Sequence, residues 1–378
     1  MARARPIAVL AVMAAALTLG ACASGARSDF GFSQREASAP IGFPNVRFSI
    51  EDDAAARSIA EQLSQGVPKG PDGHFDLVAL SGGGANGAFA AGLMAGWTES
   101  GARPDFEVVT GVSTGALAAP FVFLGSDWDD ELRRAYTDGE ASGLLKSRGL
   151  RAFFGSGVFS GAPLRALIDA HVDDRLLRAV AAEHARGRTL LVATTDLDAQ
   201  RGVIWNMGAI AAQGGPEALD LFRQVLAASA SIPGVFPPVM IRAQGRGAEF
   251  EEMHVDGGVM NPFVALPQIM WGWDDPSRVL EGARVHVIVN GKDAPRFHVT
   301  RDAAPTVLGR ALDTVLGGQL RQSLAANRAF AERRGVTFRV AAIPEDFDGG
   351  DSLDFSQGSM QAVYDLGRAL GRSGEAWK

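Results

Sequence analysis

Three short glycine-containing stretches hold the residue types that acyl-transfer chemistry needs. In "SGGG", Gly82, Gly83 and Gly84 follow an apolar run; in "GVSTG", Ser113 stands between glycines; in "VDGG", Asp256 precedes two more. A hydroxyl nucleophile, a carboxylate base and a row of backbone amides together could form and stabilise a tetrahedral oxyanion. The sequence therefore raises the hypothesis of a serine hydrolase and leaves open which residue takes the serine proton.

Ser113 has a glycine two residues away on each side, Gly111 and Gly115, in the pattern G-x-S-x-G. Such spacing allows a sharp strand-to-helix turn, called a nucleophile elbow. The turn would place the hydroxyl at a helix N-terminus, where the helix dipole favours negative charge. Serine is also a common helix N-cap, so the pattern alone leaves both a nucleophile and a simple cap open.

The glycine run follows a strand expected at 75–80 and opens a helix expected at 85–100. Several unobstructed backbone N–H groups at a helix N-terminus bind anions or a developing oxyanion. Nucleotide phosphate binding is a weaker interpretation. G-x-x-x-x-G-K-[ST] is absent, and "GGGANG", which fits G-x-G-x-x-G, has no acidic residue ending a second strand. A tight turn without a binding role is the simplest alternative.

Asp256 ends an expected strand, and the glycines after it leave its carboxylate at the end of that strand. There it could act as a catalytic group or cap an Asx-turn.

A histidine base would be the usual partner of a serine, and the chain has six histidines. Five are disfavoured by their positions: His74 upstream of the serine, His171 and His184 in charge-rich helical stretches, His286 inside a buried strand, and His298 without turn chemistry. His254 stays a candidate because it shares a strand face with Asp256, but this neighbour is poorly placed to lie between Asp256 and a serine elsewhere. We therefore expect Asp256 to be the base of a two-residue dyad.

The motifs "SGGGANGAF", "GVSTG" and "VDGGV", in this order and spacing, resemble the patatin-like phospholipase family. So do the proline-containing block "ASASIPGVFPPV" at 228–239 and the helical stretch "FSQGSMQAVYDLGRALG" at 355–371. The resemblance covers residues 74–372. It implies an α/β fold, a three-layer α/β/α sandwich with a mainly parallel central sheet.

The resemblance also implies roles: a Ser-Asp pair, with the nucleophile at Ser113 and the base at Asp256. The oxyanion hole falls on the amides of the three glycines at 82–84. One departure is Asn86, which stands where the family often has Arg or Lys. An amide donates hydrogen bonds but carries no charge, so a demand for a phosphate headgroup stays open. No cofactor or metal is expected, because no His/Asp/Glu cluster has ligand spacing.

Alternation of strands and helices from His74 onward independently predicts a mainly parallel sheet covered on both faces. Besides those already named, strands are expected at 106–110, 189–197, 202–207, 252–256, 283–289 and 336–343. Helices are expected at 113–125, 216–231, 304–334 and 357–371, and a short lead-in helix at 51–65.

The N-terminus carries Arg3 and Arg5 and then an apolar run ending in "LGAC". This end resembles a bacterial lipobox, which implies that residues 1–21 are a signal peptide and that Cys22 is the lipidated first residue of a bacterial lipoprotein. A plain signal peptide with an incidental Cys22 is the alternative. Since Cys22 is the only cysteine, disulfides within the chain are excluded. By resemblance to lipoprotein sorting rules, Ala23 after it implies the outer membrane, facing the periplasm.

The remaining domain organisation is a tether and lead-in segment at 22–73, a catalytic domain at 74–372 and a tail at 373–378. The sequence is 47% hydrophobic and 21% charged, with a net charge of −7, which is typical of a globular protein and argues against nucleic acid as a partner. Protein partners are not indicated.

The expected function is hydrolysis of carboxyl esters of membrane lipids, with a phospholipid or another lipid ester as substrate and membrane contact through the lipid anchor. A short-chain carboxylesterase or acyltransferase on the same dyad is one alternative. A non-catalytic envelope lipoprotein is the other, and the combination of serine, aspartate and three glycines argues against it.

Overall fold

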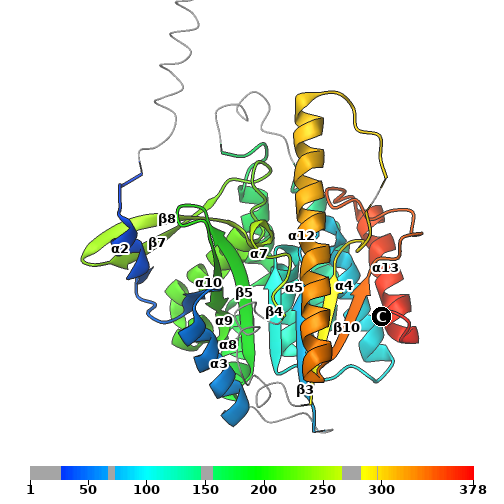
Figure 1. Ribbon diagram of the computed structural model, residues 1–378, viewed down its shortest axis with the longest axis horizontal. Coiled ribbons are helices and arrows are strands. Elements are labelled where there is room, and N and C mark those ends of the chain that lie inside the picture. Colours follow the sequence, from blue (N-terminus) through cyan, green and yellow to red (C-terminus); the bar gives the residue numbers. More distant parts are fainter. Residues whose placement is uncertain (1–26, 67–72, 146–155, 266–281, 296) are drawn as a thin grey trace, which may run out of the picture.

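A mixed β-sheet with helices on both faces organises the chain (Figure 1). The structure, a computed structural model, describes residues 27–66, 73–145, 156–265, 282–295 and 297–378. In this part of the chain the sheet has ten strands: β1 (Ala39–Pro40), β2 (Arg47–Ser49), β3 (Phe75–Leu80), β4 (Val108–Val112), β5 (Thr189–Asp196), β6 (Arg201–Asn206), β7 (Val239–Gly245), β8 (Ala248–Asp256), β9 (Ala283–Val289) and β10 (Thr337–Ala342). The described α-helices are α2 (Phe32–Glu36), α3 (Asp53–Gly66), α4 (Gly87–Glu99), α5 (Thr114–Leu124), α6 (Asp129–Thr137), α7 (Ala162–His171), α8 (Asp174–Ala185), α9 (Met207–Gln213), α10 (Gly215–Ser229), α12 (Ala304–Arg334) and α13 (Gln357–Ser373).

The strand order is β1-β7-β8-β5-β4-β3-β9-β10, with β6 against β5 and β2 against β6. From β5 to β10 all neighbours are parallel, which confirms the expected parallel core. Beyond β5 the sheet turns antiparallel through β6, β7 and β8. The two strands predicted around residues 189–207 are the antiparallel pair β5 and β6, joined by a short turn.

Alternate residues of the strands feed two cores, because successive side chains of a strand point to opposite faces. Val78 and Leu80 of β3 face the larger core, which helices α4, α5, α8, α9, α10 and α13 cover. Leu77 and Ala79 face a smaller core, covered mainly by the C-terminal half of α12. This arrangement is the three-layer α/β/α sandwich that the sequence predicts.

Glycines set the closest helix contact, between α13 and α4. A Cβ added at Gly92 would lie 1.9 Å from the carbonyl oxygen of Tyr364, and one at Gly96 would lie 2.0 Å from that of Arg368. The two helix backbones therefore touch, and any larger residue at these positions would push α13 away. The small-residue spacing of "AAGLMAGW" thus fixes the C-terminal helix against the layer that carries the glycine run.

Residues 27–50, expected as part of a tether, are instead docked on the sheet. β1 pairs with β7, and β2 pairs with β6. The ring of Phe30 stacks on that of Phe250 with centroids 4.2 Å apart, and Arg27 forms an ion pair with Asp198 at 2.6 Å. The expectation of a free tether is therefore corrected from Arg27 onward, because backbone pairing and buried charge hold this segment.

The lead-in helix expected at 51–65 is α3. The signal peptide expected at 1–21 and the lipidation site at Cys22 lie outside the described residues. Searching the described helices finds none that is both long and apolar enough to cross a bilayer.

Candidate active site

Ser113 occupies a strained turn between β4 and α5. Its φ of 57° and ψ of −126° lie in a region that non-glycine residues rarely adopt. Both flanking glycines are required by close approach: a Cβ at Gly111 would lie 2.5 Å from the carbonyl oxygen of Gly115, and one at Gly115 would lie 2.4 Å from that of Leu80. The structure thus has a sharp strand-to-helix turn at the position that the glycine spacing predicts.

The side chain of Ser113 does not cap α5. It lies instead next to the carboxyl group of Asp256, where it acts to lower the pKa of that carboxyl. The Ser113 amide donates to Oγ of Ser229 at 3.0 Å, and that hydroxyl donates in turn to the carbonyl oxygen of Ala193 at 2.7 Å. Of the two interpretations of Ser113, the geometry therefore favours the nucleophile over the simple cap.

Asp256 is the last residue of β8 and is held from several sides. Its Oδ1 accepts from the amide of Gly258 at 2.7 Å, which is the Asx-type turn that was the alternative interpretation. Its own amide donates to the carbonyl oxygen of Ser231 at 3.0 Å, and its carbonyl accepts from Oγ1 of Thr195 at 3.0 Å. The carboxylate therefore has a fixed direction and serves both as turn cap and as partner of Ser113.

Burial raises the pKa of Asp256 to about 6, against the opposing effect of its hydrogen bonds with Ser113 and Gly258. In the described part of the chain no ion pair joins this carboxylate to a cation. A carboxyl group with a pKa close to neutrality is a better proton acceptor than an ordinary aspartate. The electrostatics therefore suit a general base.

The block "ASASIPG" holds the backbone amides of both Ser113 and Asp256, a role that sequence reasoning missed. Ser229 binds the Ser113 amide through its hydroxyl, whereas Ser231 binds the Asp256 amide through its carbonyl oxygen. In the sequence this block carried only the family resemblance. The available signal was a serine at the end of α10.

The glycine run is packed against two other backbones. A Cβ at Gly83 would lie 1.9 Å from the carbonyl oxygen of Asn290, and one at Gly84 would lie 2.1 Å from that of Ser352. Both glycines also have positive φ, 158° and 56°. Close packing alone therefore demands glycine here, so the tight-turn interpretation is realised whatever else the run does.

The amides of the run differ in what they can still bind. The amide of Gly82 already donates to the carbonyl oxygen of Pro262 at 3.2 Å. The amides of Gly83 and Gly84 donate to no acceptor in the segments that the structure describes. Gly82 lies beside the serine, since a Cβ there would be 3.2 Å from Cβ of Ser113. The run thus lies next to the nucleophile with two of its three amides available.

Asn86, in the short helix η1 (Gly84–Asn86), is buried and turned away from a binding role. Its Nδ2 donates to the carbonyl oxygen of Gly350 at 3.0 Å. The amide of the preceding residue, Ala85, donates to the carbonyl oxygen of Ser352 at 2.9 Å. The side chain therefore fixes the loop that packs on the glycine run and does not replace the basic residue of the family pattern.

An apolar cavity of ≈ 50 Å³ lies close to Ser113. Its wall includes Thr114, which follows the serine, and Gly84 of the glycine run. The rest of the wall is mainly hydrophobic side chains from α5, α7 and α13, among them Leu117, Phe121 and Ile168. A cavity of this kind accommodates hydrocarbon.

His254 is buried and bonded away from the serine. Its Nδ1 lies 3.0 Å from Oγ1 of Thr194 and its Nε2 lies 3.3 Å from Oε2 of Glu252. Burial lowers its pKa, although Glu252 opposes that effect. No histidine in the described segments is a hydrogen-bond partner of Ser113 or Asp256. The structure therefore leaves Asp256 as the base candidate.

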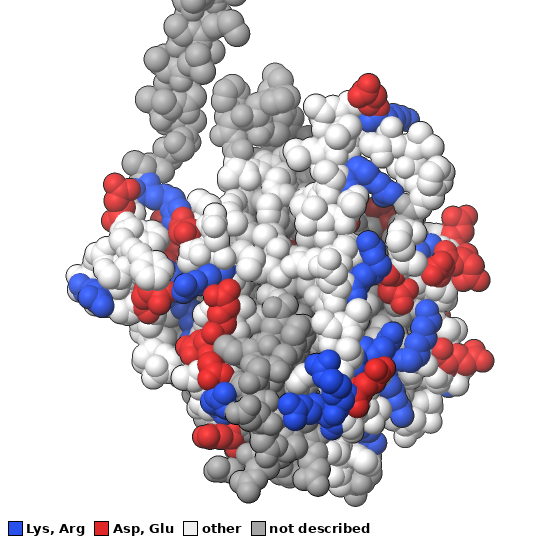
Figure 2. All heavy atoms as spheres, in the orientation of Figure 1, with Lys and Arg blue, Asp and Glu red and all other residues white. Residues whose placement is uncertain are grey.

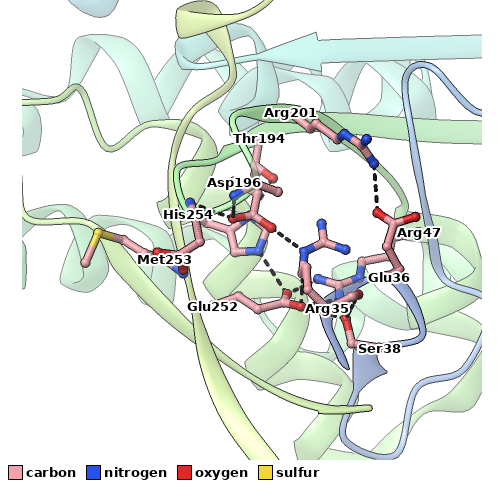
Figure 3. A network of polar contacts seen from close by, with 12 residues as sticks. Arg35, Glu36, Ser38, Arg47, Thr194, Asp196, Arg201, Glu252, Met253 and His254 are labelled. Atoms are coloured by element: carbon pink, nitrogen blue, oxygen red, sulfur yellow. Dashed lines mark hydrogen bonds and ion pairs between the residues drawn. The ribbon is translucent and has the colours of Figure 1, made fainter. Parts of the chain in front are cut away.

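His254 belongs to a buried ionic network next to the site (Figure 3). Arg35 contacts Asp196 at 2.5 Å, and Arg47 forms an ion pair with the buried Glu252. Ligand atoms of Asp196, Glu252 and His254 lie within 4.8 Å of one another, a cluster at metal-binding distances that the sequence did not reveal. Its carboxylate oxygens already bind the two guanidinium groups, so arginines supply the positive charge there.

Comparison with known proteins identifies the class. The patatin-like phospholipase family matches residues 78–267, and the chain belongs to that family. It is therefore a lipid acyl hydrolase in the broad sense, an esterase acting on lipid ester substrates. No curated protein sequence matches it.

Solved structures that resemble the chain include VipD from Legionella pneumophila, at 12% identity and a TM-score of 0.38. That match covers 83% of this chain and 70% of the VipD chain. The fold assignment rests on the strand order and the two cores described above, not on this likeness.

Proposed function

We propose that this protein hydrolyses carboxyl esters of membrane lipids through a Ser113–Asp256 dyad and an acyl-enzyme. The observation that carries the proposal is a serine in a strained turn next to a buried aspartate, whose pKa burial raises to about 6 while the serine acts to lower it. Neither a simple helix cap nor a structural aspartate requires this combination.

The proposed reaction has two halves. Asp256 accepts the Ser113 proton while Oγ attacks the ester carbonyl carbon, and the resulting oxyanion receives hydrogen bonds from the amides of Gly83 and Gly84. The positive end of the α5 dipole stabilises the same charge. Collapse breaks the ester C–O bond, and the leaving alcohol takes the proton from Asp256. Water, deprotonated by Asp256, then attacks the acyl-enzyme and releases the carboxylic acid and free Ser113.

A lipid acyl chain is supported by the apolar cavity next to Thr114 and Gly84. An acyl carbonyl at Ser113 would place its hydrocarbon chain toward Leu117 and Phe121 of α5. With Asn86 bonded to Gly350, no cation replaces the basic residue of the family pattern at that position. We therefore propose selection by the acyl group more than by the headgroup.

Ester hydrolysis by the wild type, Ser113→Ala, Asp256→Asn and His254→Ala tests the dyad. We expect near-complete loss in the first two variants and retained activity in the third. Activity in Asp256→Asn together with inactivity in His254→Ala would reject the dyad. Phospholipid, lysophospholipid and short acyl esters as parallel substrates separate a lipid hydrolase from a short-chain carboxylesterase.

We also propose that Cys22 is acylated and anchors the enzyme in the bacterial cell envelope, at the outer membrane facing the periplasm. The support is the "LGAC" sequence with the single cysteine of the chain. Detergent-free fractionation of cells that produce wild type or Cys22→Ser tests the anchor. Wild-type protein in the soluble fraction would refute it.

A further inference from the structure

The first half of α12 (Ala304–Arg334) extends from the body of the protein (Figure 1). The second half packs into the smaller core through Leu324 and Phe330. Four large hydrophobic residues of the first half have exposed fractions between 41% and 72%: Val307, Leu308, Leu312 and Val315. Isolated exposed hydrophobic residues are ordinary, but a cluster on one element marks an interaction surface.

These four residues share one side of the helix, and we call them the docking face. At about 100° per residue they fall within an arc of roughly 140°. Thr306, Arg310 and Asp313 project from the opposite side. The loop before the helix adds Phe297 and Val299, which are 95% and 75% exposed. The projecting segment is therefore amphipathic, although none of the helices that the structure describes packs against its apolar side.

The docking face lies at the same edge of the sheet as the dyad. β9 and β10 are parallel, so the helix that connects them runs the opposite way and begins at the carboxyl edge of the sheet. Ser113 directly follows β4 at that edge, and Asp256 is paired with Thr194 near the end of β5. Figure 1 shows the first half of α12 extending past this edge, and Figure 2 shows few charged side chains on it.

We propose that the docking face inserts into the surface of a lipid bilayer and holds the active-site edge against it. The inference rests on the proposed function, because a lipid hydrolase must take its substrate from such a surface. Amphipathic helices lie in the bilayer interface with the apolar side down. Arg301 and Arg310 are balanced by Asp302 and Asp313, so apolar burial rather than attraction to anionic lipid drives the contact.

The length of the chain before Arg27 supports a bilayer as the occupant. Arg27 is held by Asp198, and its Nη2 also donates to the carbonyl oxygen of Glu251 at 2.6 Å. Only five residue steps separate it from Cys22, which span at most about 18 Å. An acyl anchor at Cys22 would thus keep Arg27 close to the membrane. Figure 1 places the start of the described chain toward the same end of the molecule as the first half of α12.

A single fluorescent label tests the proposal, because Cys22 is the only native cysteine. In the full chain with Cys22→Ser, either Leu308→Cys on the docking face or Thr306→Cys on the opposite side carries an environment-sensitive dye. Phosphatidylcholine vesicles, with and without brominated acyl chains, are then added. We expect a blue shift and quenching by the brominated lipid at position 308 and neither change at position 306.

Equal responses at the two positions, or no response at 308, would overturn the proposal. So would a label at 308 that is already blue-shifted without vesicles, since the face would then be covered by the chain itself or by a second copy. This readout needs no turnover. It therefore decides the membrane contact even if the dyad proposal fails.

A kinetic comparison measures the consequence for catalysis. The double variant Leu308→Ser, Val315→Ser should lower hydrolysis of a lipid ester in phosphatidylcholine vesicles by about tenfold or more, because two apolar side chains no longer enter the bilayer. Hydrolysis of a soluble short-chain ester should be unchanged, and Thr306→Ser is the matched control. Equal losses on both substrates would contradict the proposal.

Discussion

β8 carries two buried carboxylates four residues apart that have opposite electrostatic environments. Asp256 has a hydroxyl and an amide for partners, and burial raises its pKa to about 6. For Glu252 burial also acts to raise the pKa, but hydrogen bonds with His254 and Arg47 outweigh it and hold the pKa well below its usual range. One strand thus holds a carboxylate that can take up a proton and one that stays ionised.

The difference comes from the residues that reach each carboxylate. Arg47 and Arg35 come from residues 27–50, outside the part of the chain that the family match covers, and neutralise Glu252 and Asp196. No arginine or lysine is among the ion-pair partners of Asp256 in the described residues. We infer that residues 27–50 stabilise β8 through these ion pairs and leave the carboxyl group of Asp256, at the end of that strand, able to accept a proton.

Removing the Asp256 charge should produce the largest effect on activity. We expect Asp256→Asn to lower kcat on a soluble ester by about 10⁴-fold, comparable to the loss of a general base in other serine hydrolases. The melting temperature should not fall, because a carboxylate that is hard to ionise in the fold is removed. Steady-state kinetics and calorimetry on one preparation measure both. A variant that loses activity and stability together would instead indicate a structural role.

Removing the Arg47 partner of Glu252 should lower stability and leave activity nearly unchanged. Arg47→Met removes the guanidinium that binds both carboxylate oxygens of the buried Glu252 and leaves Arg35, 3.5 Å away, as its remaining arginine partner. Removing one partner of comparable buried pairs costs about 3–5 kcal/mol of unfolding free energy. Activity per folded molecule should change little. Urea denaturation followed by fluorescence measures the loss. The double variant Arg47→Met, Glu252→Met is the control, and it should recover much of the stability because no unpaired charge remains.

The contributions of Asp256 and Glu252 to folding stability should change in opposite directions with pH. Asp256 must be ionised to act as base, so kcat/KM on a soluble ester should fall about tenfold per pH unit below about pH 6. Its raised pKa makes the opposite contribution to stability, which is fully present below pH 3.8 and is lost as the pH rises to about 6. The rise of the Asp256 pKa from 3.8 to about 6 corresponds to about 3 kcal/mol of unfolding free energy.

Glu252 has a lowered pKa, so its contribution is present above its ordinary pKa of 4.5 and is lost as the pH falls further. Unfolding free energies of wild type and Asp256→Asn between pH 4 and 7 isolate the aspartate. If the two proteins lost stability in parallel as the pH rose, the assignment to Asp256 would be wrong.

His254 should give the smallest effect. Its replacement by Ala removes a neutral group bonded to Thr194 and Glu252, and leaving such buried partners unpaired costs about 1–3 kcal/mol. The pH profile of activity should keep its midpoint near 6, because this histidine does not contact the dyad. A shifted midpoint in His254→Ala would show that the network and the site titrate together.

The sequence predicted the parallel core, because strand and helix periodicities depend only on local burial. It could not predict which charged side chains would form ion pairs with the carboxylates of β8. Arg47 and Glu252 are 205 residues apart, and no local pattern relates them. The same holds for the cluster of Asp196, Glu252 and His254, whose members come from two strands, so the expectation of no such cluster was not met.

For the site, the sequence supplied the residue types and the tight turns. Glycines at 111, 115, 83 and 84 are dictated by backbone approach, and this requirement is visible as glycine in the chain. Ser229 and Ser231, which hold the amides of Ser113 and Asp256, stood out in the sequence only as part of a block that resembles the family. The sequence also could not show that the Gly82 amide donates to the distant carbonyl oxygen of Pro262 and is therefore not available to an oxyanion.

The sequence by itself thus determined the elbow, the glycine run and the candidate aspartate, since these follow from steric demands within a few residues. Only the tertiary structure decided that Asp256 is buried with no ion-pair partner among the described residues while Glu252 is paired, and that the first half of α12 lies exposed at the sheet edge where Ser113 and Asp256 lie. Solvation and charge depend on everything that surrounds a group, and those surroundings come from segments hundreds of residues away.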